Sequence, residues 1–370
     1  MADSDRTLAA GETGTQSPPE SSRPLAASNS KPADGAARLS NEDAAVVAKM
    51  RDARARVKQE MGKVVVGQEE IIDFLLVGLL CRGHVLLQGV PGLGKTLMGR
   101  TLARTLDMEF RRIQFTPDLM PSDITGTDMI EENQTTGRHS MQFMRGPIFT
   151  NFLLADEINR TPPKTQAALL QAMQEYEVSV GRETYQLQPP FYVVATQNPI
   201  EMEGTYPLPE AQVDRFMFNL RVKYPTIDEE VQIIKGTTST LTAAADIVLK
   251  TDEVLRLQEL VRGVPIADSV VRYAARLSAS SRPGEIGTIE NIHKYIAYGA
   301  SPRASQYLVL GAKARSILAG KYHVDFADIE ALAHPVFRHR LVLNFHARAD
   351  GVDADAIIDR LVEHVPHEEP

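Results

Sequence analysis

The sequence predicts an α/β protein with a five-stranded parallel sheet, followed by a smaller α-helical domain. Three observations support this fold class: short apolar runs alternate with helix-like segments between residues 84 and 222, a glycine-rich loop follows the first run, and strand signals fade after Pro225. The predicted strands are the apolar segments His84–Gln88, Phe110–Phe115, Phe152–Ala155, Phe191–Thr196 and Phe216–Val222.

Composition and periodicity divide the chain into four parts. Residues 1–42 are rich in Ser, Pro, Ala and Thr, so they cannot bury enough apolar surface to offset chain entropy, and we expect a disordered tail. Residues 43–225 form the α/β nucleotide-binding domain, which opens with an amphipathic helix that includes Met50, Val57 and Met61 and packs on it. Residues 226–350 form the α-helical domain, and residues 351–370 an acidic C-terminal segment.

Two segments of the α/β domain do not fit a pattern of strand, crossover helix and strand. Residues 164–176 do fit this pattern: they have one apolar face and are predicted to be a crossover helix. The segment Thr125–Phe149 is expected to be an insertion. The segment Val178–Pro190 is predicted to be a β-hairpin around Gly181.

Charge and cysteine content exclude several classes of protein. The 370 residues carry 40 basic and 48 acidic side chains, and the resulting net charge of −8 argues against sequence-independent binding to nucleic acid. Most of this charge comes from the two ends, residues 1–42 and 351–370. The single cysteine, Cys81, cannot form an intramolecular disulfide, and the longest apolar run is too short to span a membrane. We therefore expect a cytoplasmic protein without a membrane span.

A complete phosphate-binding loop follows the first predicted strand. It consists of Gly89, Val90, Pro91, Gly92, Leu93, Gly94, Lys95 and Thr96, and Leu97 continues into a helix. The glycines allow backbone N–H groups to surround phosphates, and the helix N-terminus adds a partial positive charge. Lys95 is expected to reach the β- and γ-phosphates, and Thr96 to offer a hydroxyl to Mg²⁺.

Two acidic residues end the third predicted strand. Asp156 and Glu157 would lie at the carboxyl edge of the sheet, where open α/β folds bind ligands. Together with the phosphate loop they form a Walker B pair, in which Asp156 holds Mg²⁺ through its water shell and Glu157 orients the attacking water. His334, His339 and His346 lack metal-ligand spacing and are expected to be packing or surface residues, and nothing supports a phosphate contact from Arg338 or Arg340.

Five motifs in order resemble those of the MoxR family of AAA+ ATPases over about residues 46–349. They are Gly89 to Thr96, Asp156 to Arg160, Ala195 to Pro199, Leu208 to Phe216 and Gly299 to Ala304. The resemblance implies an AAA+ αβα sandwich with a C-terminal helical lid. It also implies that Asn198 is sensor 1 and that Arg215 is an arginine finger inserted into a neighbouring subunit, with Arg160 as a weaker candidate.

The same resemblance assigns two further contacts and the partners. Arg303 matches sensor 2, which would touch the γ-phosphate bound to its own chain, and Gly67 and Gln68 match the segment that lines the adenine pocket. ATP and Mg²⁺ are the expected cofactors, and a homo-oligomeric ring, expected to be a hexamer, is the expected assembly. Its client would be a partner protein, often one with a von Willebrand factor A domain.

Two other functions remain open from the sequence. An AAA+ motor or transcription regulator acting on DNA could use the hairpin Val178–Leu187, although that hairpin carries only Arg182 beside Glu183. A nucleotide-gated scaffold that hydrolyses little ATP is the other alternative, and the presence of Glu157 argues against it.

Overall fold

The computed structural model describes residues 41–132, 139–199, 204–239, 243–284 and 289–367. Its central feature is a five-stranded sheet in the order β2-β5-β8-β1-β9, in which every neighbouring pair is parallel. The strands are β1 (Val85–Gln88), β2 (Phe110–Gln114), β5 (Phe152–Asp156), β8 (Tyr192–Gln197) and β9 (Phe218–Arg221). All five predicted strands are present, with bounds within two residues of the prediction.

Alternating side chains of the sheet enter two separate cores. On β5, Phe152 and Leu154 join a core with helices α2 (Glu69–Leu80) and α3 (Lys95–Thr105). The intervening Leu153 and Ala155 join a second core with α5 (Pro163–Glu175). Because successive side chains of a strand point to opposite faces, a strand buried on both faces appears as a continuous apolar run. The expected αβα layering is therefore present.

The first described helix, α1 (Asn41–Gly62), packs on the rest of the chain as predicted. Met50, Val57 and Met61 are buried in the larger core, and the helix contacts α3 and α11 (Pro302–Leu318). Its polar side is fixed by the Arg54 guanidinium, which donates two hydrogen bonds of 2.7 Å to the carboxylate of Asp73 on α2. Of the predicted tail, residues 1–40 lie outside the described residues.

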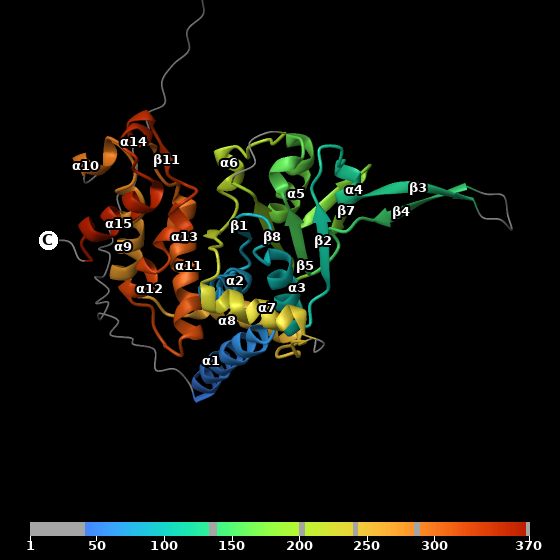
Figure 1. Ribbon diagram of the computed structural model, residues 1–370, viewed down its shortest axis with the longest axis horizontal. Coiled ribbons are helices and arrows are strands. Elements are labelled where there is room, and N and C mark those ends of the chain that lie inside the picture. The colour runs from blue at the N-terminus through green and yellow to red at the C-terminus, as the bar shows by residue number, and fades with distance from the viewer. Residues whose placement is uncertain (1–40, 133–138, 200–203, 240–242, 285–288, 368–370) are drawn as a thin grey trace, which may run out of the picture. The chain divides into compact units, whose positions relative to one another are not determined.

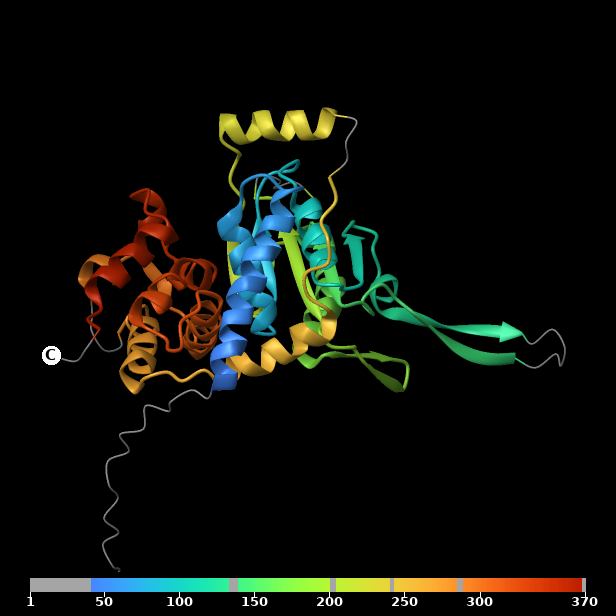
Figure 2. The ribbon, with the colours of Figure 1, turned by 90° about the horizontal axis from the view of Figure 1, so that it is seen from below.

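Two antiparallel hairpins interrupt the α/β order. The predicted hairpin is formed by β6 (Glu177–Val180) and β7 (Glu183–Gln186). The insertion after α4 (Pro121–Thr125) is a second hairpin, formed by β3 (Gly126–Glu132) and β4 (His139–Arg145), which extends away from the sheet (Figures 1 and 2). Short helical turns η1 (Ile158–Arg160) and α6 (Glu210–Val213) follow β5 and precede β9.

The chain after β9 is mostly helical, as predicted. Its elements are α7 (Ile227–Thr238), α8 (Thr251–Gly263), α9 (Asp268–Ala279), α10 (Glu290–His293), β10 (Ile296–Tyr298), α11, α12 (Phe326–Glu330), α13 (Ala333–Phe337), β11 (Val342–Leu343), α14 (Phe345–Ala349) and α15 (Ala354–His364). Helix α8 contacts both α2 and α11, so it joins the α/β domain to the helical domain. The first turn of α7 is closed by a capping box between Thr226 and Glu229.

The C-terminal segment differs from the prediction. Up to residue 367, where the described part ends, this segment is not a separate acidic end, because α15 packs on α13 with Ile357, Ile358 and Leu361 fully buried. The side chain of Asp353 caps the helix by accepting a hydrogen bond from the Ala356 N–H. The net charge of the segment does not predict this packing, because the charged residues lie on one face of an amphipathic helix and the apolar residues on the other.

Candidate nucleotide site

The carboxyl ends of three adjacent strands bring the predicted motifs together. The phosphate loop follows β1, Asp156 and Glu157 end β5, and Asn198 follows β8, which lies between the other two strands. The Gly89 N–H donates a 3.2 Å hydrogen bond to the Gln197 carbonyl, which ties the start of the loop to the end of β8. Asn198 is buried at this edge, between the acidic pair and the loop, as expected for its predicted position.

The phosphate loop has the backbone that its glycines predict. Gly92 and Gly94 have φ values of 86° and 73°, in the left-handed region, and a Cβ added at either would meet no atom within 4 Å. The loop therefore needs glycine for its conformation and leaves open space beside its backbone. The Lys95 ammonium group folds back onto the loop, donating to the carbonyls of Gly89 and, at 3.2 Å, of Val90.

Asp156 is fixed by two neighbours from adjacent strands. Its Oδ1 accepts a 2.5 Å hydrogen bond from the Thr196 hydroxyl of β8, and its Oδ2 accepts two from the Arg112 guanidinium of β2, at 2.9 and 2.7 Å. Only 11% of the Asp156 side chain is exposed. The carboxylate is thus held at the sheet edge by a hydroxyl and a cation.

Glu157 has an unusual backbone and two side-chain partners. Its φ of 58° is left-handed, which is uncommon for a residue with a Cβ and is typical of functional sites. Its Oε2 accepts a 2.8 Å hydrogen bond from the Gln114 amide and lies 3.1 Å from Nε of Arg160. Arg160, the weaker candidate for an interface arginine, therefore pairs with the acid of its own chain.

The sequence did not single out Arg112, Gln114 or Thr196. They occur inside strand-forming runs, and only the register of the sheet shows what they reach: Gln114 lies opposite Asp156 in the parallel pair of β2 and β5. A usable signal existed for Gln114 and Thr196, because polar residues at the carboxyl ends of neighbouring parallel strands converge on one edge.

Gly67 and Gln68 lie beside the segment that follows β9. The Gln68 amide donates a 2.9 Å hydrogen bond to the Lys223 carbonyl, and a Cβ at Gly67 would lie 2.3 Å from Oε1 of Glu229. The preceding Val222 lies 3.0 Å from where a Cβ of Gly89 would stand. The segment predicted to line the adenine pocket is therefore next to the start of the phosphate loop.

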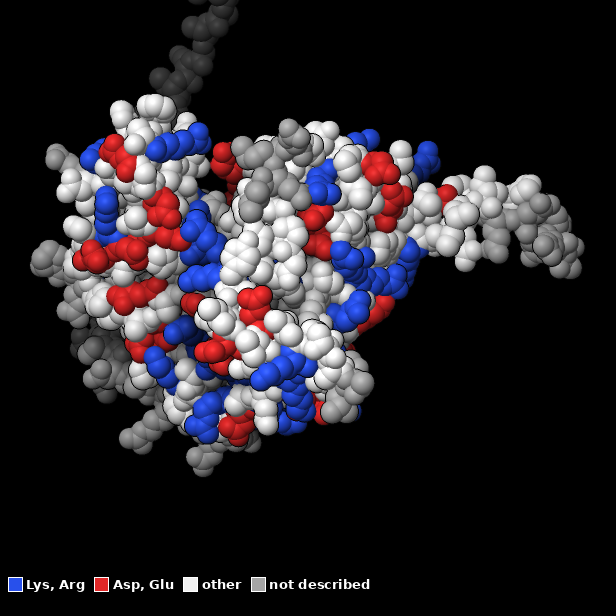
Figure 3. All heavy atoms as spheres, in the orientation of Figure 1, with Lys and Arg blue, Asp and Glu red and all other residues white. Residues whose placement is uncertain are grey.

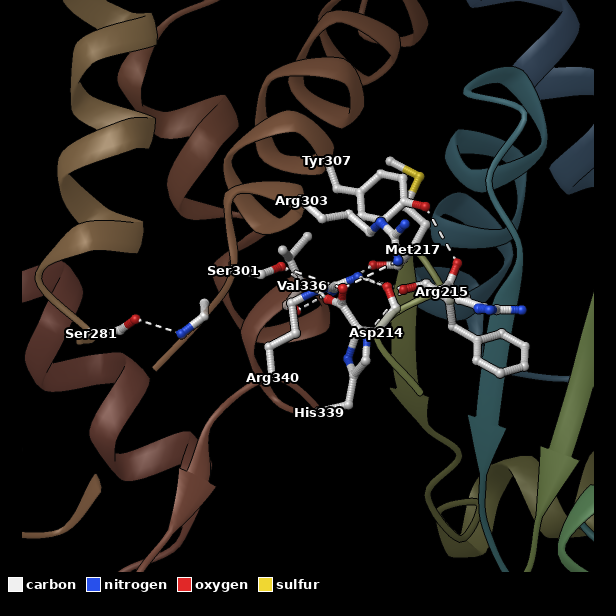
Figure 4. A network of polar contacts seen from close by, with 12 residues as sticks. Asp214, Arg215, Met217, Ser281, Ser301, Arg303, Tyr307, Val336, His339 and Arg340 are labelled. Atoms are coloured by element: carbon white, nitrogen blue, oxygen red, sulfur yellow. Dashed lines mark hydrogen bonds and ion pairs between the residues drawn. The ribbon is translucent and has the colours of Figure 1, made fainter. Parts of the chain in front are cut away.

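Asp214 is the centre of a second polar network, between the α/β domain and the helical domain (Figure 4). Its carboxylate accepts hydrogen bonds from Arg340 at 2.7 Å, from Arg303 at 3.2 Å and from the Ser301 hydroxyl at 3.3 Å. The Arg340 side chain is 1% exposed, and it also donates to the carbonyls of Asp214 and Phe216, at 2.8 and 2.6 Å. Burial lowers the pKa of Arg340, an effect that Asp214 opposes.

Arg215 lies at the opposite end of the strands from the phosphate loop. The register pairs β1 and β9 in parallel, and the Met217 N–H bonds the His84 carbonyl before β1 begins, whereas the loop follows the last residue of β1. The Arg215 guanidinium donates to the Leu170 carbonyl of α5 at 2.8 Å, and its own carbonyl accepts from the Tyr307 hydroxyl at 3.3 Å.

This placement corrects the expectation for Arg303. It was expected to reach a γ-phosphate on its own chain, but its side chain bonds Asp214 at the amino end of β9, away from its own phosphate loop. Arg303 and Arg215 are thus on the same side of the subunit. The physical reason is the Asp214 network, in which Arg340 holds the start of β9 against the helical domain.

Arg338, His334 and His339 contact groups of their own chain. His334 bonds Asp359 at 2.8 Å, and Arg338 bonds Asp355 at 2.7 Å. The His339 ring lies 3.0 Å from the Phe216 carbonyl, and burial lowers its pKa well below the usual value. His339 is thus buried in the packing, His334 is a half-buried side chain beside two aspartates, and His346 is exposed. Among the described residues, no group of three or more His, Cys, Asp or Glu side chains is placed to hold a metal ion.

The residues at the sheet edge fit Mg²⁺ and a nucleotide. Mg²⁺ prefers few protein oxygens together with water and phosphate, and Thr96 and Asp156 supply a hydroxyl and a carboxylate. The open space beside Gly92 and Gly94 leaves room for phosphates at the N-terminus of α3. Along the parts of the chain that the structure describes, no helix is long and apolar enough to cross a membrane.

Comparison with known proteins assigns the family. The profile for the ATPase family associated with various cellular activities (AAA) matches residues 84–218, and the AAA lid domain matches residues 289–361. The chain is 44% identical to "Chaperone MoxR1" of Mycobacterium tuberculosis, over 83% of this chain and 80% of that protein. It is 32% identical to "Protein MoxR" of Paracoccus denitrificans, over 86% and 96% of the two chains.

A solved structure agrees in fold. The crystal structure of a protein from Cytophaga hutchinsonii, provisionally assigned as an ATPase, superposes with a TM-score of 0.80 at 42% identity, and covers 88% of this chain and 97% of that one. The sheet order, the lid and the relatives lead to one assignment: the chain belongs to the MoxR family of AAA+ ATPases.

Proposed function

We propose that this protein is a Mg²⁺-dependent ATPase that works as a homo-oligomeric ring, expected to be a hexamer, and uses ATP hydrolysis to remodel or assemble client proteins. The observation that supports it most is the division of the site. Lys95, Asp156, Glu157 and Asn198 lie at one edge of the sheet, whereas Arg215 lies at the opposite end of the same strands. One chain thus contains both halves of a site that two chains would complete.

The residues at the carboxyl edge bind and orient. Lys95 would contact the β- and γ-phosphates after leaving the loop carbonyls, and Thr96 and Asp156 would hold the metal ion. When bound, Mg²⁺ neutralises phosphate charge. Glu157 would accept a hydrogen bond from the attacking water and align it, and the Asn198 amide would fix the same water. Gln114 and Arg160 now hold the Glu157 carboxylate, so they set its resting position.

Two arginines would act on the neighbouring subunit. Arg215 and Arg303 lie beside Asp214, away from their own phosphate loop, where a neighbour's nucleotide could meet them. A guanidinium delivered in trans stabilises the charge of the transition state and makes hydrolysis depend on assembly. To do this, the Arg215 guanidinium must first leave the Leu170 carbonyl.

An exposed apolar hairpin supports contact with client proteins. On β3 and β4, Met129, Ile130, Met141 and Met144 are 50–71% exposed, and the hairpin extends away from the sheet (Figure 2). Flexible methionine side chains adapt to varied partners. A client with a von Willebrand factor A domain is the expectation carried by the family resemblance.

The alternatives are less well supported. On the face drawn in Figure 3, acidic and basic side chains are intermixed, whereas a DNA motor would need a continuous basic track. The hairpin of β6 and β7 carries Arg182 beside Glu183, as the sequence showed. A scaffold that hydrolyses little ATP would not need a carboxylate to orient water, whereas Gln114 and Arg160 hold the Glu157 carboxylate in a defined position.

Turnover and nucleotide binding test the proposal together. We expect Glu157→Gln to bind ATP normally but to hydrolyse it about 100-fold more slowly or worse, because the water loses its positioning carboxylate. Lys95→Ala should weaken binding itself. Both are measured by phosphate release and by fluorescent-nucleotide titration, and unchanged turnover in both variants would disprove the assignment.

The chaperone part needs a separate measurement. A ring blocked by Glu157→Gln in ATP should retain client protein in a pull-down, and the same variant carrying Ile130→Ser and Met141→Ser should retain less. If the blocked ring retains nothing at full ATP occupancy, the remodelling role is contradicted, even when the unmodified protein hydrolyses ATP.

A further inference from the structure

A large groove lies on the side of the molecule opposite the phosphate loop. Its volume is about 990 Å³, and its walls come from both domains: the end of α2, the segment between β7 and β8, and helices α8, α9 and α11. Arg82 and Phe191, which line it, precede β1 and β8, whereas the nucleotide motifs follow these strands. The groove is therefore separate from the candidate nucleotide site.

Three cations line this groove without a carboxylate among the described lining residues. They are Arg82, Arg262 and Lys313. Arg82 and Lys313 donate to neutral groups: Nε of Arg82 donates to Oε1 of Gln258 at 3.1 Å, and Nζ of Lys313 donates to the Arg262 carbonyl at 3.1 Å. Burial lowers the pKa of Lys313, and no acid opposes this effect. The groove thus contains positive charge whose counter-ion is not part of the described chain.

The rest of the lining is apolar or neutral. The apolar part includes Leu187, Phe191, Val271 and Leu310, and Ser305 and Gln306 add groups that can bond a peptide backbone. Val271 is 38% exposed, although it lies beside these apolar neighbours. A small hydrated anion would pair with the cations but leave the apolar walls in water. A peptide with acidic and apolar side chains would pair with the cations and also cover the apolar walls.

We propose that this groove binds a peptide segment of a partner protein in which acidic side chains pair with Arg82, Arg262 and Lys313 and apolar side chains pack against Leu187, Phe191 and Leu310. Charge complementarity selects the occupant. The expected contacts are carboxylates with a guanidinium or an ammonium group, which are the strong, charge-assisted kind.

The groove also contacts the segment that carries Arg215. Tyr307 lines the groove, and its hydroxyl donates to the Arg215 carbonyl at 3.3 Å. The Arg340 guanidinium lies 5.1 Å from the centre of the Tyr307 ring. A bound segment would therefore touch a side chain that is bonded to the backbone of Arg215, the proposed finger, so we expect its binding to change turnover. Only this consequence rests on the proposed function.

Selection from a random dodecapeptide display library on the full-length protein tests the site without using ATPase activity. We expect the enriched sequences to combine Asp or Glu with Leu or Phe. A synthetic enriched peptide, labelled for fluorescence anisotropy, should bind at least about tenfold more weakly to Arg262→Gln/Lys313→Gln, because two charge-assisted bonds are lost. Its affinity should fall as salt rises.

Two further variants separate the groove from other surfaces. Ala275→Trp places a large ring in the groove from an exposed position on α9 and should block binding, whereas Arg256→Gln removes an exposed cation of α8 outside the groove and should not. The proposal is overturned if no acidic sequences are enriched, or if the double variant binds normally. It is equally overturned if Arg262→Gln/Lys313→Gln changes the oligomeric state in sedimentation, since a second copy of the chain would then be the occupant.

Discussion

His84 is a buried imidazole whose tautomer is fixed by its two partners. The Val193 N–H donates to Nδ1 at 3.0 Å, so Nε2 carries the proton and donates to the Met173 carbonyl at 2.9 Å. A second proton has no place in this arrangement. Burial accordingly lowers the pKa of His84 to about 4.

This shift predicts a loss of stability in mild acid. The unfolded chain takes up the proton below about pH 6.5, whereas the folded chain resists it until about pH 4, so stability is full above 6.5 and falls as the pH drops through this window. The expected contribution is about 2 kcal/mol lost between pH 7 and pH 5. Urea unfolding at both pH values measures it, and His84→Gln should lose about that much less than the unmodified protein. Equal losses would contradict the shift.

Arg340 is expected to stabilise the folded chain through its buried ion pair with Asp214. It is buried and paired with Asp214, so Arg340→Met should lower the free energy of unfolding by about 3 kcal/mol, because the carboxylate and the carbonyls lose their donor. Arg303 bonds the same carboxylate from a more exposed position, and Arg303→Met should cost about 1 kcal/mol or less. Urea denaturation compares them. Equal costs would mean that burial of the Arg340 pair does not matter.

Helix α15 shows how one element decides the extent of a domain. Its apolar face is fully buried, so Leu361→Ala should cost about 2–5 kcal/mol in unfolding free energy through the cavity it leaves. Glu363 is exposed on the same helix, and Glu363→Ala should change stability by about 0.5 kcal/mol or less. Thermal or urea unfolding distinguishes them, and a negligible effect of Leu361→Ala would place α15 outside the lid.

For the assembled protein, the two-chain site predicts complementation between inactive variants. Arg215→Ala keeps an intact phosphate loop but lacks the finger, and Lys95→Ala keeps the finger but lacks a functional loop. Each alone should be nearly inactive. Mixed and reassembled, they should recover part of the turnover, because some sites join a good loop to a good finger.

The control for complementation is a mixture that cannot produce a complete site. Lys95→Ala mixed with Lys95→Ala/Arg215→Ala should stay inactive at the same protein concentration. If the first mixture also stays inactive while sedimentation shows mixed oligomers, Arg215 does not act in trans.

The parts of the site that depend on a local sequence pattern could be predicted. The phosphate loop needs left-handed glycines followed by a helix, and Asp156 and Glu157 end a buried run, so both are visible within a few residues of sequence. The contacts of Arg112 and Gln114 could not be predicted, because they depend on which strand lies next to β2.

Local sequence patterns were enough to predict the strands of the sheet, the phosphate loop and the acidic pair, because turn conformation and strand periodicity are encoded by residues close together in the chain. Packing between distant segments places Arg303 at the amino end of β9, adds α15 to the lid and brings three cations to one groove. The reason is separation along the chain. Arg340 and Asp214 are 126 residues apart, and no local pattern records a contact that only the packing of two domains creates.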